Sequence, residues 1–210
     1  MVKAKERVGI YGGAFSPIHM GHVRAAYAFL NEMRLDKLII VPSERPPHKK
    51  DMPGATDGDR LNMARLAFEG SGEYRVGRIE ISDFELKLNT QSYTACTLEH
   101  FASPGRILYF LVGTDVFLKL SRWYRAEDIF RLADIVLMRR EDEDGMLRLI
   151  KEKSAEYIRE YGAKVHVLDL PSTVISSSDV RVRLSAGLPT EGLLPSPVEE
   201  YIKNNNLYRN

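Results

Sequence analysis

Short apolar runs alternate along the chain with longer segments in which apolar residues recur every three or four positions. The short runs predict buried strands at residues 8–11, 38–41, 107–112, 135–138 and 165–168. The helical spacing predicts helices at residues 23–33, 59–68, 93–101 and 198–202. Because strands alternate with helices, we expect the α/β class, with a Rossmann-like, doubly wound parallel sheet covered by helices on both faces.

Nothing in the sequence divides this pattern into parts. The chain has no linker rich in Gly, Ser or Pro and no internal repeat, so we expect a single domain over residues 1–210, with a C-terminal helical segment at about 176–210 packed on it. The most polar stretch, residues 139–145, contains four successive acidic residues and predicts an exposed turn rather than a metal site.

The composition of the chain excludes several classes of protein. The 210 residues include 30 Lys and Arg against 29 Asp and Glu, so a net charge of +1 gives no electrostatic argument for a nucleic-acid or membrane partner. A hydrophobic content of 44% excludes a disordered chain. The single cysteine, Cys96, excludes an intrachain disulfide and a multi-cysteine metal site. No apolar run is long enough to span a membrane, and residues 8–11 are too short for the core of a signal peptide, so we expect a cytoplasmic protein.

In a doubly wound sheet, the residues that bind ligands are expected directly after the carboxyl ends of the strands. The first predicted strand is followed by residues 12–22, with the sequence GGAFSPIHMGH. A plain strand-to-helix turn accounts for the glycines and Pro17, but not for His19 and His22. These two histidines share one face at a helix start, where free N–H groups and the helix dipole already attract anions. With no further zinc ligands nearby, the segment predicts a phosphate site.

A second helix start lies near the end of the chain, at residues 175–181 with the sequence ISSSDVR. A serine before the first turn is a good N-cap, and capping alone would explain it. Arg181, however, is a cation in the first turn, where it opposes the helix dipole unless an anion is bound. Hydroxyls, N–H groups and a guanidinium together suit a polyphosphate. A salt bridge from Arg181 to Asp179 or another acid is the structural alternative.

The two segments resemble the paired signatures of nucleotidyltransferases that carry a His-x-Gly-His motif. Further motifs resemble the bacterial nicotinate-nucleotide adenylyltransferase family: PPHK at 46–49, SYT at 92–94, Gly113-x-Asp115 and Trp123. The tail of the chain also resembles that family's ending, through Arg183, Gly187, Leu194, Pro195, Val198, Tyr201, Ile202, Leu207 and Tyr208. The ordered set covers nearly the whole chain.

Four positions depart from the family pattern. Ser16 stands where the family usually has Asp, and Leu88 and Thr90 stand where it commonly has Arg and Gly. Ser178 stands where Thr is more frequent, and both residues carry a hydroxyl. Ser16 lies in the segment after the first predicted strand, and Leu88 and Thr90 lie in the loop expected to hold the pyridine nucleotide.

The resemblance implies a reaction and its substrates. Nicotinate mononucleotide is joined to the AMP part of ATP, giving nicotinate adenine dinucleotide and pyrophosphate, in the biosynthesis of NAD. The attacking phosphate oxygen is already ionised near neutral pH, so no general base is required. Mg²⁺ would arrive with the triphosphate, because the sequence shows no carboxylate cage for it. Whether the loop at 46–58 closes on substrate and whether the chain forms a homo-oligomer stay open.

The resemblance also implies site residues. The expected catalytic residues are His19, His22 and Arg181. The expected ATP-binding residues are Gly12, Gly13, Phe15, His19, Gly21, His22, Gly113, Asp115, Ile175, Ser176, Ser177, Ser178 and Arg181. The expected mononucleotide-binding residues are Lys49, Thr90, Ser92, Tyr93, Thr94 and Trp123. Structural roles compete with several of them: a loop anchor for Trp123, a helix cap for residues 92–94, and an exposed basic loop for Lys49.

Other functions were weighed against this one. A sister transferase with another acceptor, such as pantetheine phosphate or a sugar phosphate, shares the first signature but usually lacks the PPHK and SYT segments and the tryptophan. A non-catalytic nucleotide sensor is suggested by Ser16, Leu88 and Thr90, but it does not need both histidines and Arg181. A Rossmann dehydrogenase is disfavoured because the first loop lacks Gly-x-Gly-x-x-Gly.

Overall fold

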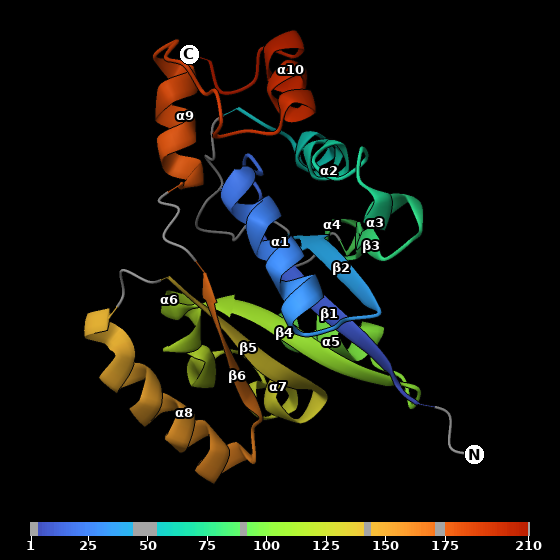
Figure 1. The fold of residues 1–210 in the computed structure, drawn as a ribbon, viewed down its shortest axis with the longest axis vertical. Coiled ribbons are helices and arrows are strands. Elements are labelled where there is room, and N and C mark those ends of the chain that lie inside the picture. Colours follow the sequence, from blue (N-terminus) through green and yellow to red (C-terminus); the bar gives the residue numbers. More distant parts are fainter. Residues whose placement is uncertain (1–3, 44–53, 89–91, 141–143, 171–174, 210) are drawn as a thin grey trace. The chain divides into compact units, whose positions relative to one another are not determined.

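The structure, a computed structural model, describes residues 4–43, 54–88, 92–140, 144–170 and 175–209. Its strands are β1 (Glu6–Gly13), β2 (Lys37–Pro42), β3 (Ile79–Ile81), β4 (Arg106–Gly113), β5 (Ala133–Arg140) and β6 (Val165–Leu170). Its α-helices are α1 (Met20–Glu32), α2 (Asp57–Leu66), α3 (Gly72–Arg75), α4 (Phe84–Lys87), α5 (Thr94–Phe101), α6 (Thr114–Phe117), α7 (Ala126–Leu132), α8 (Leu147–Tyr161), α9 (Ser177–Ser185) and α10 (Ser196–Asn204). Figure 1 shows these elements in chain order.

The strands form one sheet in the order β3-β2-β1-β4-β5-β6. The pairings of β1 with β4, β4 with β5 and β5 with β6 are parallel. This order, with the direction of winding reversing between β1 and β4, is that of a doubly wound Rossmann-like sheet. The predicted fold class is therefore confirmed.

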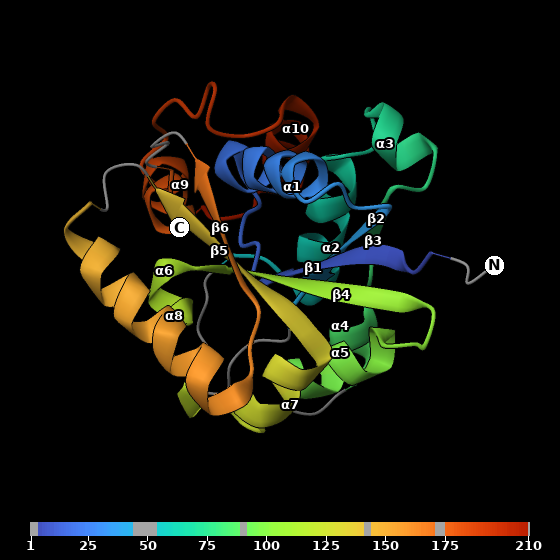
Figure 2. The ribbon, with the colours of Figure 1, turned by 60° about the horizontal axis from the view of Figure 1, so that its bottom comes forward.

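The contacts within the chain divide it into two compact units, each assembled from three separate segments. The first unit comprises Met1–Tyr11, Ala28–Ile39 and Ser92–Ser172. Its core is formed by the buried residues of β4 and β5, and Figure 2 shows α5 and α7 on one face of these strands. The fully buried Tyr157 ties α8 to this core by donating a hydrogen bond to the carbonyl of Phe117 at 2.7 Å.

The second unit comprises Gly12–Tyr27, Ile40–Gln91 and Thr173–Asn210. Helix α2 begins with a capping box, in which Thr56 and Asp59 satisfy each other's backbone N–H groups. The Tyr201 hydroxyl of α10 donates to Asp59 at 2.8 Å and accepts from Asn62 at 3.3 Å, which joins α10 to α2. Burial raises the pKa of Asp59, but the hydrogen bonds from Thr56 and Tyr201 outweigh it, so its pKa lies below the usual value.

Most predicted elements are confirmed, with ends that differ by a few residues. The 15-residue α8 is absent from the predictions, although Leu147, Ile150 and Tyr157 recur in it at helical spacing among seven charged residues. Helix α7 and strand β3 were also missed. The turn predicted at 139–145 is wrong at its start, since β5 continues to Arg140; residues 141–143 lie outside the described residues.

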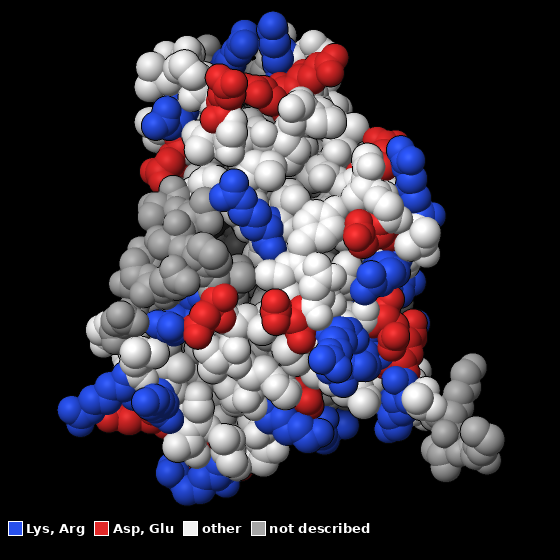
Figure 3. All heavy atoms as spheres, viewed as in Figure 1, with Lys and Arg blue, Asp and Glu red and all other residues white. Residues whose placement is uncertain are grey.

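The surface agrees with the balanced composition. Figure 3 shows acidic and basic side chains mixed over the face that it displays. In the described part of the chain, no helix combines the length and the apolar character that a membrane span requires.

Candidate functional site

The segment between β1 and α1, which we call the phosphate loop (residues 12–22), holds a strained residue at its centre. Phe15 has a φ of 45°, which is rare for a bulky side chain, and its ring is almost fully buried. A Cβ on Gly13 would lie 3.0 Å from that ring, so glycine leaves the space that Phe15 fills. A Cβ on Gly12 would meet no atom within 4 Å, so this position borders open space.

Four carbonyl groups of the phosphate loop accept hydrogen bonds from elsewhere in the second unit. The Ser43 N–H donates to the Gly13 carbonyl at 2.8 Å, and the Ser177 hydroxyl donates to the Pro17 carbonyl at 3.0 Å. Two guanidinium groups also donate at 2.6 Å, that of Arg60 to the Ala14 carbonyl and that of Arg181 to the Ser16 carbonyl. In a trans peptide the N–H points away from the C=O. The donors therefore fix the direction in which the N–H groups of residues 14, 15 and 18 point.

The two histidines at the start of α1 stack on each other. Their ring centroids are 3.7 Å apart with an interplanar angle of 23°, and the His19 side chain is buried whereas His22 is half-buried. A Cβ on Gly21 would lie 3.0 Å from the His19 ring. Glycine at this position therefore allows the two rings to stack.

Each ring accepts a backbone hydrogen bond at Nδ1. The His19 N–H lies 3.3 Å from Nδ1 of His22, and the His22 N–H lies 3.4 Å from Nδ1 of His19. A ring nitrogen that accepts carries no proton, so in each neutral imidazole the proton is on Nε2. In this tautomer the Nε2–H of each ring is a hydrogen-bond donor.

The start of α9 meets the phosphate loop within the second unit. Ser176 is the N-cap and accepts from the N–H of Asp179, so the predicted capping role is present. Ser177 bonds to Pro17, and Arg181 reaches the Ser16 carbonyl with one terminal nitrogen and Ser178 with the other. In the described residues Arg181 has no ion pair, and the Asp179 carboxylate accepts from the Ser176 hydroxyl instead. The two segments singled out in the sequence are therefore brought together.

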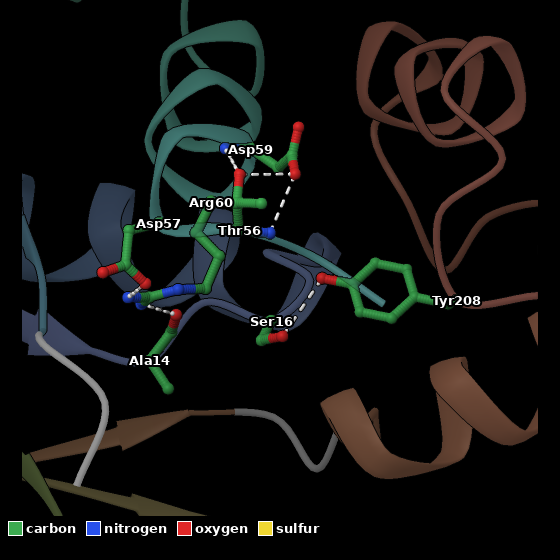
Figure 4. A network of polar contacts seen from close by, with 7 residues as sticks. All are labelled: Ala14, Ser16, Thr56, Asp57, Asp59, Arg60 and Tyr208. Carbon is green, nitrogen blue, oxygen red and sulfur yellow. Dashed lines mark hydrogen bonds and ion pairs between the residues drawn. The ribbon is translucent and has the colours of Figure 1, made fainter. Parts of the chain in front are cut away.

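Ser16, one of the departures from the family pattern, has a partner at the far end of the chain. Its hydroxyl lies 3.1 Å from the hydroxyl of Tyr208, and both side chains are buried (Figure 4). Burial raises the pKa of Tyr208 to about 12, against the opposing effects of Ser16, Arg181 and Arg60. The Tyr208 backbone packs on Gly54, where a Cβ would come within 2.6 Å of the Tyr208 nitrogen. A neutral tyrosine thus holds the phosphate loop from the C-terminal tail.

The remaining predicted residues belong to the first unit or lie outside the described residues. Gly113 caps α6 and Asp115 is exposed in its first turn. Tyr93 is the N-cap of α5 without a side-chain capping bond, and its ring lies 4.4 Å from that of Tyr124. Trp123 is half-buried at the end of a short 3₁₀ turn, Leu120–Arg122. Lys49 and Thr90 lie outside the described residues.

Two residues that hold the phosphate loop were given no role by the sequence, Arg60 and Ser43. Arg60 left a detectable signal, because it shares the buried face of α2 with Met63 and Ala64 at helical spacing. A charged residue on an otherwise apolar face calls for a specific partner. Ser43 left none, since it acts through its backbone.

A protein-built metal site was sought among the described side chains. In these ranges, no group of three or more His, Cys, Asp or Glu residues is placed to hold a metal ion. The donors around the phosphate loop are imidazole, hydroxyl, guanidinium and backbone N–H groups, which suit an anion rather than a cation.

Comparisons with known proteins identify relatives of this chain in sequence and in structure. A family model described as cytidylyltransferase-like matches residues 10–183. A protein of Desulfatibacillum aliphaticivorans named "Probable nicotinate-nucleotide adenylyltransferase" is 35% identical, covering 96% of this chain and 99% of its own length. A protein of Caldicellulosiruptor saccharolyticus with the same name is 34% identical, covering 97% and 99%. The solved Plasmodium falciparum nicotinic acid mononucleotide adenylyltransferase complexed with NaAD shares the fold, with a TM-score of 0.77, 20% identity and 97% of both chains covered.

The hydrogen bonds at Nδ1 predict the tautomer of both histidines. Long-range ¹H–¹⁵N NMR correlations at mildly alkaline pH should show an unprotonated Nδ1 and a protonated Nε2 in His19 and in His22. Spectra of His19→Asn and His22→Asn assign the two rings. A protonated Nδ1 in either neutral ring would contradict the geometry described above.

Proposed function

The chain belongs to the nicotinate-nucleotide adenylyltransferase family, and we propose that the phosphate loop and the start of α9 are the part of it that binds and activates ATP. The enzyme joins nicotinate mononucleotide and ATP to nicotinate adenine dinucleotide and pyrophosphate in NAD biosynthesis. The observation that carries the proposal is the meeting of two helix starts, one with a histidine pair and one with Arg181, through the hydrogen bonds from α9 to Ser16 and Pro17.

The histidines supply neutral donors to the reacting phosphate. In the transfer, an oxygen of the mononucleotide phosphate forms a bond to the α-phosphorus of ATP, and the bond from that phosphorus to the bridging oxygen of pyrophosphate breaks. The attacking oxygen is ionised and carries no proton, so no side chain has to act as a base. Nε2–H groups of His19 and His22 stabilise the charge on the α-phosphate oxygens, with His22 nearest to the reaction because it is the less buried ring.

Arg181 has two tasks in this proposal. It orders the phosphate loop through the Ser16 carbonyl, and its two hydrogen bonds to the described residues occupy only part of its five N–H donors. The rest attract the β- and γ-phosphates and stabilise the charge that develops on pyrophosphate as it leaves. Ser177 and Ser178 flank this group, while the Ser176 hydroxyl is committed to the N-cap.

The mononucleotide is assigned to residues of the motifs between the two signatures. Trp123 is proposed to stack on the pyridine ring, and Ser92, Tyr93 and Thr94 to bind its carboxylate. Lys49 is proposed for the phosphate and Asp115 for sugar hydroxyls. Mg²⁺ is proposed to enter with ATP, bound by the triphosphate and water, where it neutralises phosphate charge. A cytoplasmic location is part of the same proposal.

The reaction is tested with an acceptor panel. Wild-type protein with ATP and Mg²⁺ should release pyrophosphate with nicotinate mononucleotide and should not do so with pantetheine phosphate or with no acceptor. A coupled pyrophosphate assay, with product identified by mass spectrometry, separates the alternatives. Turnover with pantetheine phosphate instead would identify a sister transferase, and ATP binding without any release would identify a sensor.

The role of His22 is tested by substitution. His22→Ala should lower kcat by ~10²-fold or more, the usual loss for one preorganised donor to a developing charge. His100→Ala, a change at an exposed histidine at the end of α5, is the matched control and should retain wild-type turnover. Circular dichroism and the melting temperature verify folding. Near-normal kcat in a folded His22→Ala protein would refute the assignment.

A further inference from the structure

We propose that Arg60 is a positioning residue for adenylyl transfer. Its hydrogen bond to the Ala14 carbonyl keeps the phosphate loop in its strained, binding-competent form. The inference rests on the proposed assignment of this loop to ATP. It extends that assignment to a residue of α2 that has no contact role in the chemistry proposed above.

Arg60 lies in the first turn of α2 with only 1% of its surface exposed. One terminal nitrogen donates to the Ala14 carbonyl at 2.6 Å and the other pairs with Asp57 at 2.8 Å, whose side chain is 43% exposed (Figure 4). The Nε–H is buried and has no hydrogen-bond partner in the part of the chain that the structure describes. The two contacts therefore point the buried guanidinium at the backbone of the phosphate loop.

Stability alone does not favour this arrangement. Burial of a guanidinium is costly, and a buried N–H without a partner adds to that cost. A cation in the first turn of a helix also opposes the helix dipole. An apolar side chain of similar length would pack against Met63 and Ala64 without these penalties. The guanidinium provides two contacts that an apolar side chain does not, the ion pair with the partly exposed Asp57 and the bond to the Ala14 carbonyl, and only the second reaches the phosphate loop.

That bond controls a peptide plane with two orientations. Reversing the peptide between Ala14 and Phe15 changes the φ of Phe15 by half a turn, from 45° into the extended region that any residue adopts. The observed orientation is therefore the strained one at Phe15. It persists because the carbonyl on each side of Phe15 is held by a guanidinium, Ala14 by Arg60 and Ser16 by Arg181, both at 2.6 Å.

The reversal would change the electrostatics of the phosphate loop. With Ala14 held by Arg60, the carbonyl oxygen faces the guanidinium and the N–H of Phe15 points the opposite way. Without Arg60 the peptide can turn over and relieve Phe15, which places a carbonyl oxygen where the N–H was. A carbonyl oxygen repels a phosphate oxygen, so the loss should affect ATP and leave the mononucleotide unaffected.

The test uses Arg60→Met, which keeps length and removes the donors. We expect kcat/KM for ATP to fall by ~10²-fold, the scale of a small misplacement at a reacting centre, with KM for nicotinate mononucleotide unchanged. Arg65→Met, the same change at an exposed arginine of α2, should retain wild-type kinetics. Arg60→Lys restores one charged donor, so it should recover part of the lost kcat/KM. Wild-type kinetics in Arg60→Met, or an equal loss for both substrates, would overturn the inference.

A second readout keeps the inference separate from the proposed function. The crystal structure of Arg60→Met, or of Arg60→Lys if the first variant does not fold, should show the 14–15 peptide reversed, or both orientations, with a negative φ at Phe15. A single peptide orientation with φ near its wild-type value overturns the inference whatever the activity. If the wild-type protein forms no nicotinate adenine dinucleotide, the proposed function is refuted. If the peptide is nevertheless reversed in the variant, the role of Arg60 in shaping the loop still holds.

Discussion

The hydrogen bonds that hold the carbonyl groups of the phosphate loop are the constraint on which the rest of the site depends. Strand β1 leads into a segment whose central residue, Phe15, is in a left-handed conformation that its side chain disfavours. Donors from α2, α9 and the end of β2 hold the surrounding carbonyls. The orientations of the N–H groups of residues 14, 15 and 18 follow from these bonds.

Arg60 and Arg181 differ in what they do beyond this constraint. Arg60 is fully buried and pairs with Asp57, so its charge is compensated inside the protein. Arg181 is half-buried and has no ion pair in the described residues, so its charge is available to an anion. Tyr208 approaches both guanidiniums, and its raised pKa keeps it neutral, so it adds a hydrogen bond to Ser16 without cancelling the positive charge. Both cations thus order the loop, and Arg181 is in addition the one proposed to attract phosphate.

The sequence was sufficient for the fold class and for the two segments that the structure brings together and to which we assign the chemistry. Histidines at a helix start and an arginine in a first turn are local signals, because each conflicts with ordinary helix preferences. The partners of the phosphate loop are not local: Arg60 is 46 residues from Ala14, and Tyr208 is 192 residues from Ser16. The signal of helix α8, by contrast, was local, since Leu147, Ile150 and Tyr157 recur at helical spacing among its charged residues. Pairwise contacts set by topology cannot be inferred from one chain's pattern.

The account is tested most directly by the structure of the protein with a non-hydrolysable ATP analogue. It predicts that oxygens of the α-phosphate lie within hydrogen-bond distance of Nε2 of the histidine pair. The β- and γ-phosphates should lie against Arg181 and the first turn of α9, with the Ala14 carbonyl still bound to Arg60. A triphosphate bound elsewhere, or one that contacts neither imidazole while Arg181 keeps only its protein partners, would contradict the claim that these two helix starts form the ATP site.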